Sequence, residues 1–523
     1  MQQKLQLVLY PRQAAIKKEL HAIVAAKLNI DAARIQHIAI ERKSIDARMR
    51  IPKVNVSLVA YIDEKPAPNL SEKLFPTVTN APEALVVGAG PAGLFAALKL
   101  IERGVKPIVL EKGKNVSERK KDIAALCRNI SFNENSNFCF GEGGAGAFSD
   151  GKLYTRSHKK GNIREILEIL HQHGAQDEIL VEAHPHIGSD KLPLIIKNIR
   201  ETILKSGGEI HFEQAIVDLL LDKNRTVEGV VTSDGKQWKA KAVILATGHS
   251  ACDIYELLHT KGIALEAKGF AAGVRVEHPQ TLIDNIQYHL AFNQKRNEYL
   301  PAAAYTLAEQ VDGRGVYSFC MCPGGHIVPS ASAENEIVVN GMSASQRNSP
   351  FANSGIVVEI RPEDLAEWNE QYGVMGGLKF RQHLEHLAFI NNGGKGQKAP
   401  AQRVGDFVQG KLSASLPECS YLPGVISSPL HFWLPEIISR RLREGFKQFD
   451  RKMRGFLTNE ALVIGVESRS SSPLRIPRNK DSLQHIEIKG LYPCGEGAGY
   501  AGGITSSAMD GQNCAEKTAD YLF

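Results

Sequence analysis

A glycine-rich loop between a short apolar run and a helical segment constrains the fold of this chain more than any other feature. The apolar run 84–87 enters the loop 88–93, which reads Gly-Ala-Gly-Pro-Ala-Gly. Residues 94–103 have the pattern of a helix, and a second apolar run, 105–110, ends at Glu111. A strand, a glycine loop, a helix and a second strand in this order are typical of a doubly wound parallel sheet. The sequence therefore predicts an α/β fold.

The glycines of this loop have the spacing that dinucleotide binding requires. Gly88 permits the tight turn, Gly90 lets the backbone lie against the phosphates, and Gly93 lets helix and strand pack closely. The helix N-terminus offers unpaired N–H groups and a favourable dipole to the pyrophosphate. Glu111 follows Gly93 by eighteen residues, where a carboxylate can accept hydrogen bonds from ribose hydroxyls. A tight turn without a ligand is the alternative, and the flanking strand, helix and acid favour the dinucleotide.

Two further segments indicate which dinucleotide is bound. Residues 242–248 form an apolar strand that ends in a small-residue loop, and residues 491–510 combine a strand, a glycine-dense loop and a helix. In this chain order the segments resemble the FAD-binding fold of the glutathione-reductase superfamily. The resemblance implies non-covalent FAD, with Gly495 and Glu496 near its ribitol or pyrophosphate. It also implies that the helix beginning near Gly503 directs its N-terminus at the flavin ring.

Four longer phrases resemble a narrower family. They are CFGEGGAGAFSDGKLYTR (139–156), FCMCPGGHIV (319–328), NGMSASQRNSPFANSG (340–355) and ESRSSSPLRIPR (467–478). With the C-terminal glycine loop they are similar to the bacterial FAD-dependent dehydrogenase-like proteins, also described as NAD(FAD)-utilising dehydrogenases. The resemblance spans nearly the whole chain and implies the cofactor rather than a substrate.

The resemblance also assigns residues to the cofactor. It places the glycines of segment 143–146 over the pyrophosphate and the flavin. The expected FAD contacts are Gly88, Ala89, Gly90, Pro91, Ala92, Gly93, Glu111, Lys112, Gly143, Gly144, Gly146, Val217, Ala246, Thr247, Gly248, Gly495, Glu496, Gly503 and Ile504.

The chain is long enough for several domains. Residues 1–65 predict a small β-α-β-β domain, and residues 66–82, with four prolines, predict a linker. Residues 83–250 are expected to begin a Rossmann-type FAD-binding domain, a parallel sheet with a three-stranded β-meander. Residues 461–523 are expected to complete it, and residues 251–460 to form a mixed α+β substrate domain.

A dedicated nicotinamide-binding unit is not indicated. Disulfide reductases of this superfamily carry a second glycine fingerprint for NAD(P)H, and none is found between residues 250 and 460. The glycines of segment 373–377 have the wrong spacing and no apolar strand before them. NAD(P)H is therefore expected, at most, as a transient electron donor.

Catalytic residues are weakly indicated. Cys320 and Cys322 are paired thiols that could exchange electrons with a flavin. On an extended strand, however, they share a face with Cα atoms about 6.6 Å apart, which is awkward for a disulfide and favours a packing role. The other candidates are Ser149, Asp150, Arg275 and Arg403. The arginines would clamp an acidic substrate, unless they form structural ion pairs.

Composition bounds the class of protein. The chain has 63 basic and 57 acidic side chains, and a net charge of +6 is too mild to predict nucleic-acid binding. Its eight cysteines form no Cys-x-x-Cys pair or zinc-like spacing, so no metal is expected. No run approaches the roughly 18 apolar residues of a membrane span, and the N-terminus lacks a signal core. We therefore expect a reduced, cytoplasmic protein without a membrane partner.

These observations favour an FAD-dependent oxidoreductase (a dehydrogenase or reductase) that acts on an unidentified small or medium-sized substrate beside the flavin ring. Two alternatives stay open. One is a redox sensor or scaffold that holds FAD without turnover. The other is a flavin-dependent RNA-modifying or RNA-binding protein, using the N-terminal domain and the basic face of an amphipathic helix predicted over residues 435–454. The sequence contains no indication of oligomeric state.

Overall fold

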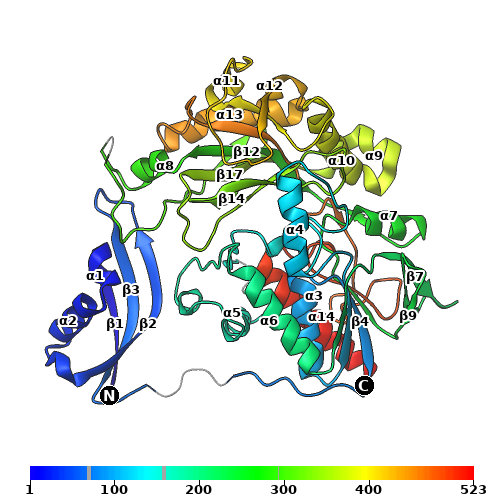
Figure 1. Ribbon diagram of the computed structural model, residues 1–523, viewed down its shortest axis with the longest axis horizontal. Coiled ribbons are helices and arrows are strands. Elements are labelled where there is room, and N and C mark those ends of the chain that lie inside the picture. The colour runs from blue at the N-terminus through cyan, green and yellow to red at the C-terminus, as the bar shows by residue number, and fades with distance from the viewer. Residues whose placement is uncertain (67–71, 156–160, 292–293) are drawn as a thin grey trace.

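The computed structural model describes residues 1–66, 72–155, 161–291 and 294–523 (Figure 1). Residues 67–71 of the expected linker, and Arg156 at the end of one family phrase, lie outside the described residues. The described chain forms three parts, which we call the N-terminal unit, the parallel-sheet part and the seven-stranded part (Figure 1).

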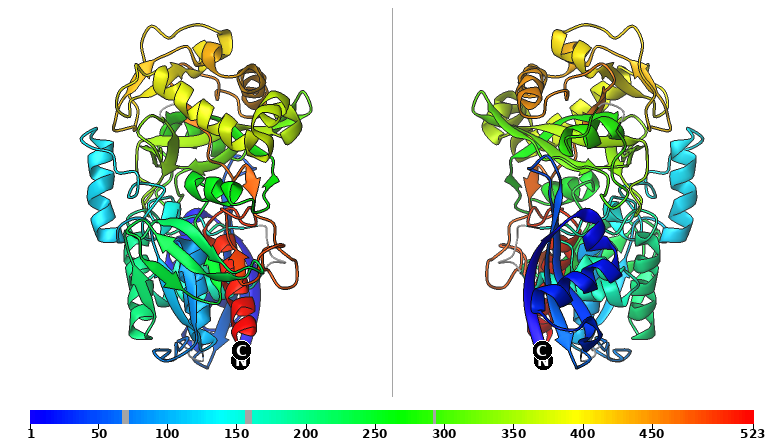
Figure 2. Two further views of the ribbon diagram at one scale, coloured as in Figure 1. Left: turned by 90° about the vertical axis from the view of Figure 1, so that its right-hand side faces the viewer. Right: turned by 90° about the vertical axis from the view of Figure 1, so that its left-hand side faces the viewer.

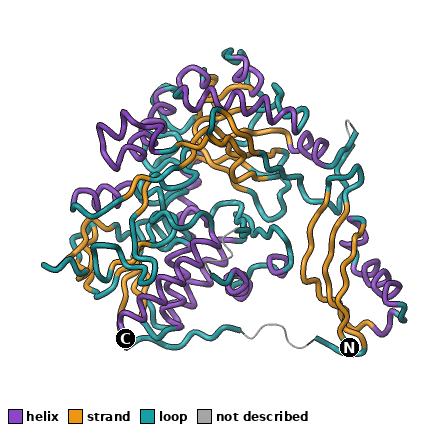
Figure 3. The backbone as a smooth tube through the Cα atoms, turned by 180° about the vertical axis from the view of Figure 1, so that it is seen from behind, coloured by secondary structure: helices purple, strands orange, loops and turns teal. Residues whose placement is uncertain are grey.

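The N-terminal unit is the expected β-α-β-β arrangement. Its strands pair antiparallel in the order β1-β3-β2, and its helices cover the face of the sheet that points away from the rest of the molecule (Figure 3). Leu7 and Leu9 of the first strand alternate with exposed residues and pack against the helices in a small separate core. The elements are β1 (Gln2–Leu9), α1 (Pro11–Ala15), α2 (Lys17–Leu28), β2 (Ile35–Asp46) and β3 (Lys53–Ile62).

A five-stranded parallel sheet confirms the predicted Rossmann-type fold. Its strand order is β22-β10-β4-β5-β6, and every neighbouring pair is parallel. An antiparallel three-stranded meander, β7-β8-β9, lies between β6 and β10 in the chain. The strands are β4 (Glu83–Val87), β5 (Lys106–Leu110), β6 (Glu209–His211), β7 (Ile216–Leu221), β8 (Val227–Thr232), β9 (Gln237–Lys239), β10 (Val243–Leu245) and β22 (Leu491–Pro493).

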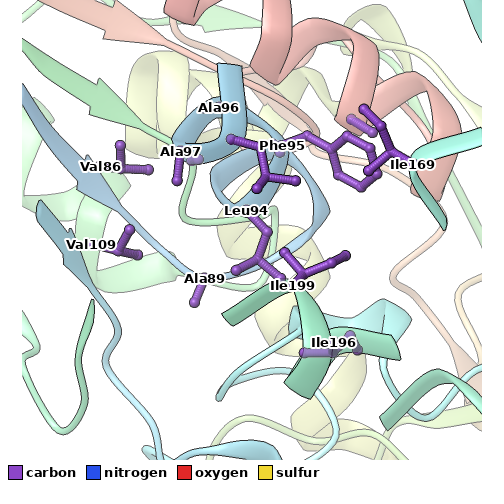
Figure 4. Close-up of a cluster of buried hydrophobic side chains, with 14 of the residues drawn as sticks. Val86, Ala89, Leu94, Phe95, Ala96, Ala97, Val109, Ile169, Ile196 and Ile199 are labelled. Carbon is purple, nitrogen blue, oxygen red and sulfur yellow. The ribbon is translucent and has the colours of Figure 1, made fainter. Parts of the chain in front are cut away.

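Side chains of the parallel sheet alternate between two cores. Val86 and Val109 face α3, whereas Leu85 and Leu110 face the meander and α7. Figure 4 shows Val86, Val109 and Phe95 of α3 in the first of these cores. Helix α3 is buried along most of its length because α14 and α6 cover the sides that the sheet does not. The helices are α3 (Pro91–Glu102), α4 (Val116–Cys127), α5 (Ile163–Gln172), α6 (Leu192–Lys205), α7 (Cys252–Thr260) and α14 (Ile504–Leu522).

The seven-stranded part has the strand order β13-β14-β17-β12-β20-β18-β19, antiparallel except for the pair β18–β19. A short hairpin of β15 and β16 lies beside it, and β11 pairs with β21. The strands are β11 (Glu266–Ala267), β12 (Phe270–Pro279), β13 (Ala308–Val311), β14 (Arg314–Cys322), β15 (His326–Pro329), β16 (Val339–Met342), β17 (Phe351–Ile360), β18 (Ala399–Arg403), β19 (Val425–Ser427), β20 (Leu462–Glu467) and β21 (Leu474–Arg475).

Strand β20 belongs to the seven-stranded part, although the sequence predicted that the FAD-binding domain resumes at residue 461. β20 begins almost where residues 461–523 were expected to return to the FAD-binding domain, but it pairs with β12 and β18 in the seven-stranded sheet. All six of its residues are buried, which suits a central strand. The chain therefore returns to the parallel-sheet part only after Glu467.

Helices cover the seven-stranded sheet on the side away from the parallel sheet (Figures 1 and 2). The longest of them, α13, is the amphipathic helix expected near residues 435–454, with Ile438, Leu442 and Phe446 buried in the core. These helices are α8 (Gln280–Gln287), α9 (Ala366–Tyr372), α10 (Gly376–Ile390), α11 (Val404–Gln409), α12 (Leu430–Trp433) and α13 (Glu436–Lys452). Within the described ranges, no helix combines the length and the apolar character needed to cross a membrane.

Candidate functional site

A cavity of about 310 Å³ lies between the parallel-sheet part and the seven-stranded part. Its walls are the loops that follow β4, β10 and β22, the segment 139–152, and residues of β14 and β16. The three loops lie at the carboxyl ends of neighbouring parallel strands, which is where open α/β sheets bind ligands.

The loop 88–93 leaves its backbone open to this cavity. A Cβ on Gly88 would lie 2.5 Å from the carbonyl oxygen of Ala246, and one on Gly93 would overlap the carbonyl oxygen of Gly88. Gly90 caps α3 without a side-chain hydrogen bond, so the first N–H groups of the helix have no cap. This arrangement fits a pyrophosphate, whose negative charge would lie at the helix N-terminus.

Glu111, at the end of β5, connects two glycine-rich segments. Its Oε2 accepts a hydrogen bond from the backbone N–H of Ala89 at 2.7 Å, and its Oε1 accepts from Gly113 and Gly141 at 2.9 Å each. Glu111 also lines a smaller neighbouring cavity, together with Lys112. Its carboxylate therefore shapes the loops, and contact with a ribose remains a prediction.

The beginning of the segment 139–152 is anchored to α4 by a residue that sequence reasoning missed. The guanidinium of Arg119, on α4, is fully buried and donates to four backbone carbonyl groups between residues 137 and 142. This positions Gly144, where a Cβ would lie 3.1 Å from the Cα of Gly90. A single arginine in a helix gives no sequence signal for such a role.

Glu496 organises the glycine loop before α14. Its Oε2 accepts from Nδ1 of His249 at 3.0 Å, and its Oε1 accepts from the backbone N–H of Gly503, the N-cap of α14. Burial opposes the charge on Glu496, but the hydrogen bond and the charge of His249 lower its pKa below the ordinary value. A Cβ on Gly248 or Gly503 would meet no atom within 4 Å, so both glycines border open space.

The end of the cavity near the seven-stranded part carries polar side chains, among them the catalytic candidates Ser149 and Asp150. Asp150 is buried and pairs with Arg347, and Lys152 lies beside it. The hydroxyl of Ser149 donates to the carbonyl oxygen of Gly146 and so belongs to a turn. Cys320, Cys322 and Asn340 complete this end.

The two cysteines do not have the predicted geometry. The sequence predicted an extended strand with both thiols on one face, but the register of β14 against β17 shifts between Phe319 and Cys322, and Cys320 has a φ of +45°. Cys320 is exposed whereas Cys322 is buried, because the irregularity interrupts the regular alternation of the strand.

Three other predicted residues lie away from both cavities. Val217 is 52% exposed, and its neighbour Ile216 lines the smaller cavity instead, because alternate residues of β7 face opposite ways. Arg275 is buried and pairs with Glu467 at 3.0 Å. Arg403 pairs with Asp406 at 2.6 Å. Neither arginine can therefore clamp a substrate in the cavity.

The remaining expected cofactor residues fall into two groups. Ala89, Gly93 and Gly143 do not line the main cavity. They lie at contacts between the packed loops and helices behind it. Those that line the main cavity are Gly88, Gly90, Pro91, Ala92, Glu111, Gly144, Gly146, Ala246, Thr247, Gly248, Gly495, Glu496, Gly503 and Ile504.

Among the described residues, one group of side chains has the spacing of a metal site. It consists of Cys494, Asp510 and Cys514, whose ligand atoms lie within 4.8 Å of one another. Arg478 already donates to this group, at 2.6 Å to Oδ1 of Asp510 and 3.3 Å to Sγ of Cys514. The guanidinium thus supplies the positive charge, and the site does not fit a metal ion.

Comparison with known proteins identifies the family. Family models match residues 269–470 as the C-terminal domain of an FAD-dependent protein, residues 83–268 as glucose inhibited division protein A, and residues 1–61 as a domain of unknown function. An uncharacterized protein of Clostridium beijerinckii is 41% identical over 513 residues, which is 94% of each chain. The chain belongs to this family of FAD-dependent proteins. As a member it is a flavoprotein of the oxidoreductase class.

Other similarities are narrower. The tRNA uridine 5-carboxymethylaminomethyl modification enzyme MnmG of Chlamydia abortus is 28% identical over 172 residues. This match covers 32% of the present chain and 24% of that enzyme. Among solved structures, CtdE in complex with FAD and substrate 4 is 11% identical over 84% of this chain and 83% of that chain, with a TM-score of 0.32. A geranylgeranyl bacteriochlorophyll reductase-like protein of Thermoplasma acidophilum is 13% identical over 84% and 78% of the two chains, with a TM-score of 0.34.

Proposed function

We propose that the protein oxidises or reduces a small or medium-sized substrate in the main cavity, with non-covalent FAD as its cofactor. The observation that carries this proposal is the continuity of the cavity. The same cavity is lined by the glycine loop and Glu111, by the loop before α14, and by Lys152 and Cys320 near the seven-stranded part. Bound there, FAD would supply the two-electron chemistry.

The two ends of the cofactor would be held by different elements. The smaller cavity, lined by Lys112, Gln214, Ile216 and Asp253, adjoins Glu111 and suits the adenosine end. The uncapped N-terminus of α3 would bind the pyrophosphate. In the same cavity, the N-terminus of α14 would favour negative charge on the flavin ring.

The electron donor is proposed to bind transiently, and NAD(P)H is the candidate. The sheet of the seven-stranded part supports this, because its described strands are antiparallel except for β18 and β19. A dinucleotide-binding unit of the Rossmann type requires parallel strands joined by a glycine loop and a helix. A donor would therefore use the open mouth of the main cavity.

A role on RNA is less well supported. The similarity to the tRNA-modifying enzyme covers 172 residues, which is 32% of this chain and 24% of that enzyme. The charged face of α13 is partly neutralised, since Arg440 pairs with Asp312 at 2.8 Å and Lys447 with Glu444 at 2.7 Å.

The test starts from the purified protein. We expect a yellow protein that releases one FAD per chain on heat denaturation, and whose flavin is reduced anaerobically by NADH or NADPH at a rate that rises with donor concentration. A chain that binds no FAD after reconstitution would refute the proposal. A flavin that accepts electrons from no donor would favour a sensor or scaffold.

A further inference from the structure

Lys152 brings an incompletely neutralised positive charge to the cavity. Its Nζ lies 3.4 Å from Oδ2 of Asp150, but the same carboxylate also accepts hydrogen bonds from Arg347 at 2.6 and 3.2 Å. Two cations thus share one carboxylate, and in the described part of the chain no other carboxylate lies within ion-pair distance of Lys152. The Lys152 side chain is 38% exposed and lines the cavity.

Cys320 is aimed into the same space by an unusual backbone. A positive φ is unfavourable for a residue with a Cβ, and it occurs here at the register shift of β14. Two donors hold this conformation at the carbonyl oxygen of Cys320: Nη2 of Arg275 at 3.2 Å and Sγ of Cys322 at 3.3 Å. Irregularities of this kind beside binding sites redirect a side chain.

We propose that Lys152 and Cys320 form a subsite for a carboxylate group of the substrate. The ammonium group of Lys152 is its counter-charge, and the thiol of Cys320 contacts it. This inference rests on the proposed function, because it assigns a substrate class to the same cavity. Asn340 lines the cavity beside them, and its Oδ1 accepts from the backbone N–H of Gly341, which leaves the amide NH2 as a further donor.

The ionisation of the neighbours supports an anion at this position. Cys320 is accessible from the cavity, but the surrounding protein desolvates its thiol and raises the pKa to about 11, so at neutral pH it carries no charge that would repel a carboxylate. The protein around the cavity desolvates the Lys152 ammonium group and opposes its charge, but the attraction of nearby groups, Asp150 among them, raises its pKa above the ordinary value. His186 lies near Lys152 and Asp150. Burial, and then the charge of Arg347, lower the pKa of His186. The positive charge of Lys152 therefore persists.

Two alkylating reagents that differ in charge test the subsite. The FAD-loaded full-length protein is treated with iodoacetate, an anion, or with neutral iodoacetamide, and modification rates at each cysteine are measured by peptide mass spectrometry. Cys127 is the internal reference, because burial also raises its pKa to about 11 and it lies on α4 outside both cavities. We expect the iodoacetate-to-iodoacetamide rate ratio to be about tenfold higher at Cys320 than at Cys127, as a nearby unit charge in a partly desolvated site implies.

Variants assign this preference to Lys152. Lys152→Met should lower the ratio at Cys320 to that at Cys127, and Lys152→Arg should keep it high. Lys379→Met, which removes a half-exposed lysine paired with Glu256 outside the cavity, should leave it unchanged. Equal ratios at Cys320 and Cys127 in the wild-type protein, or no labelling of Cys320 by either reagent, would overturn the inference. Since FAD content is measured separately by absorbance, its loss would refute the proposed function without deciding the charge preference, which FAD-depleted protein would still report.

Discussion

Arg347 binds both carboxylate oxygens of Asp150, with Nη2 2.6 Å from Oδ2 and Nε 3.2 Å from Oδ1. Asp150 follows the glycine segment 143–146, and Arg347 lies in the loop between β16 and β17. The pair therefore joins the parallel-sheet part to the seven-stranded part at the edge of the cavity. Because Asp150 is only 3% exposed, this contact is poorly screened by solvent.

Replacing Asp150 by Asn should lower the free energy of unfolding by about 3 kcal/mol at pH 7, because Arg347 would lose the counter-charge of a largely buried pair. The measurement is urea denaturation of the FAD-loaded protein. Asp520→Asn is the matched control: it breaks the exposed pair with Arg103 and should cost less than about 1 kcal/mol. Equal effects of the two substitutions would contradict the prediction.

The same pair predicts a loss of stability in acid. Burial alone would raise the pKa of Asp150, but Lys152 and Arg347 outweigh it and lower the pKa below the ordinary value. A carboxyl group with a lowered folded-state pKa stabilises the protein fully above its unfolded-state pKa of about 3.9, and this contribution is lost as the pH falls through the folded value. The stability difference between wild type and Asp150→Asn should therefore stay constant between about pH 5 and 7 and shrink below about pH 4. A difference that widened on acidification would disprove this.

Enlarging Gly90 should empty the cofactor site without unfolding the chain. A Cβ at this position would lie 3.8 Å from the Cα of Gly144, an ordinary contact, whereas a longer side chain would fill the space that the pyrophosphate needs. We expect Gly90→Leu to retain no FAD and Gly90→Ala to retain part of it, as measured by absorbance. The melting temperature of FAD-depleted wild type is the control, and both variants should match it once they too are depleted of FAD. Full FAD occupancy in Gly90→Leu would show that the pyrophosphate lies elsewhere.

Nicotinamide binding should be weak. Without a dedicated unit, NADH or NADPH should bind the FAD-loaded protein with a Kd above about 100 µM in a calorimetric titration. Tight binding of either nucleotide would mean that the seven-stranded part holds a nucleotide site of another kind.

Cys320 and Cys322 should not act as an obligatory redox pair. β14 is irregular between Phe319 and Cys322, and Cys322 is buried with its thiol donating to the carbonyl oxygen of Cys320. Anaerobic reductive titration should therefore show two electrons per FAD both in wild type and in a Cys320→Ser/Cys322→Ser double variant. Uptake of two further electrons by wild type alone would show that the pair is redox-active.

The local features of the chain determined its parallel-sheet part. The spacing in the loop 88–93, the apolar strands around it and the glycine loop before α14 predicted the Rossmann-type sheet and most of the cavity wall, because strands, turns and helix N-termini depend on neighbouring residues. The same reasoning predicted the N-terminal unit, whose alternating strands and short connections are also local.

Only the tertiary structure decided the polar end of the cavity. The Asp150–Arg347 pair spans 197 positions of sequence, and Arg119 contacts carbonyl groups beyond its own helix. The exposed thiol of Cys320 results from a register shift between two paired strands, and a strand read from sequence alone has no register. The sequence suggested Arg275 and Arg403 as substrate-binding residues, but in the structure each forms an ion pair with a carboxylate of the chain. A buried charge requires an oppositely charged partner, and the tertiary packing of distant segments decides which side chain that partner is.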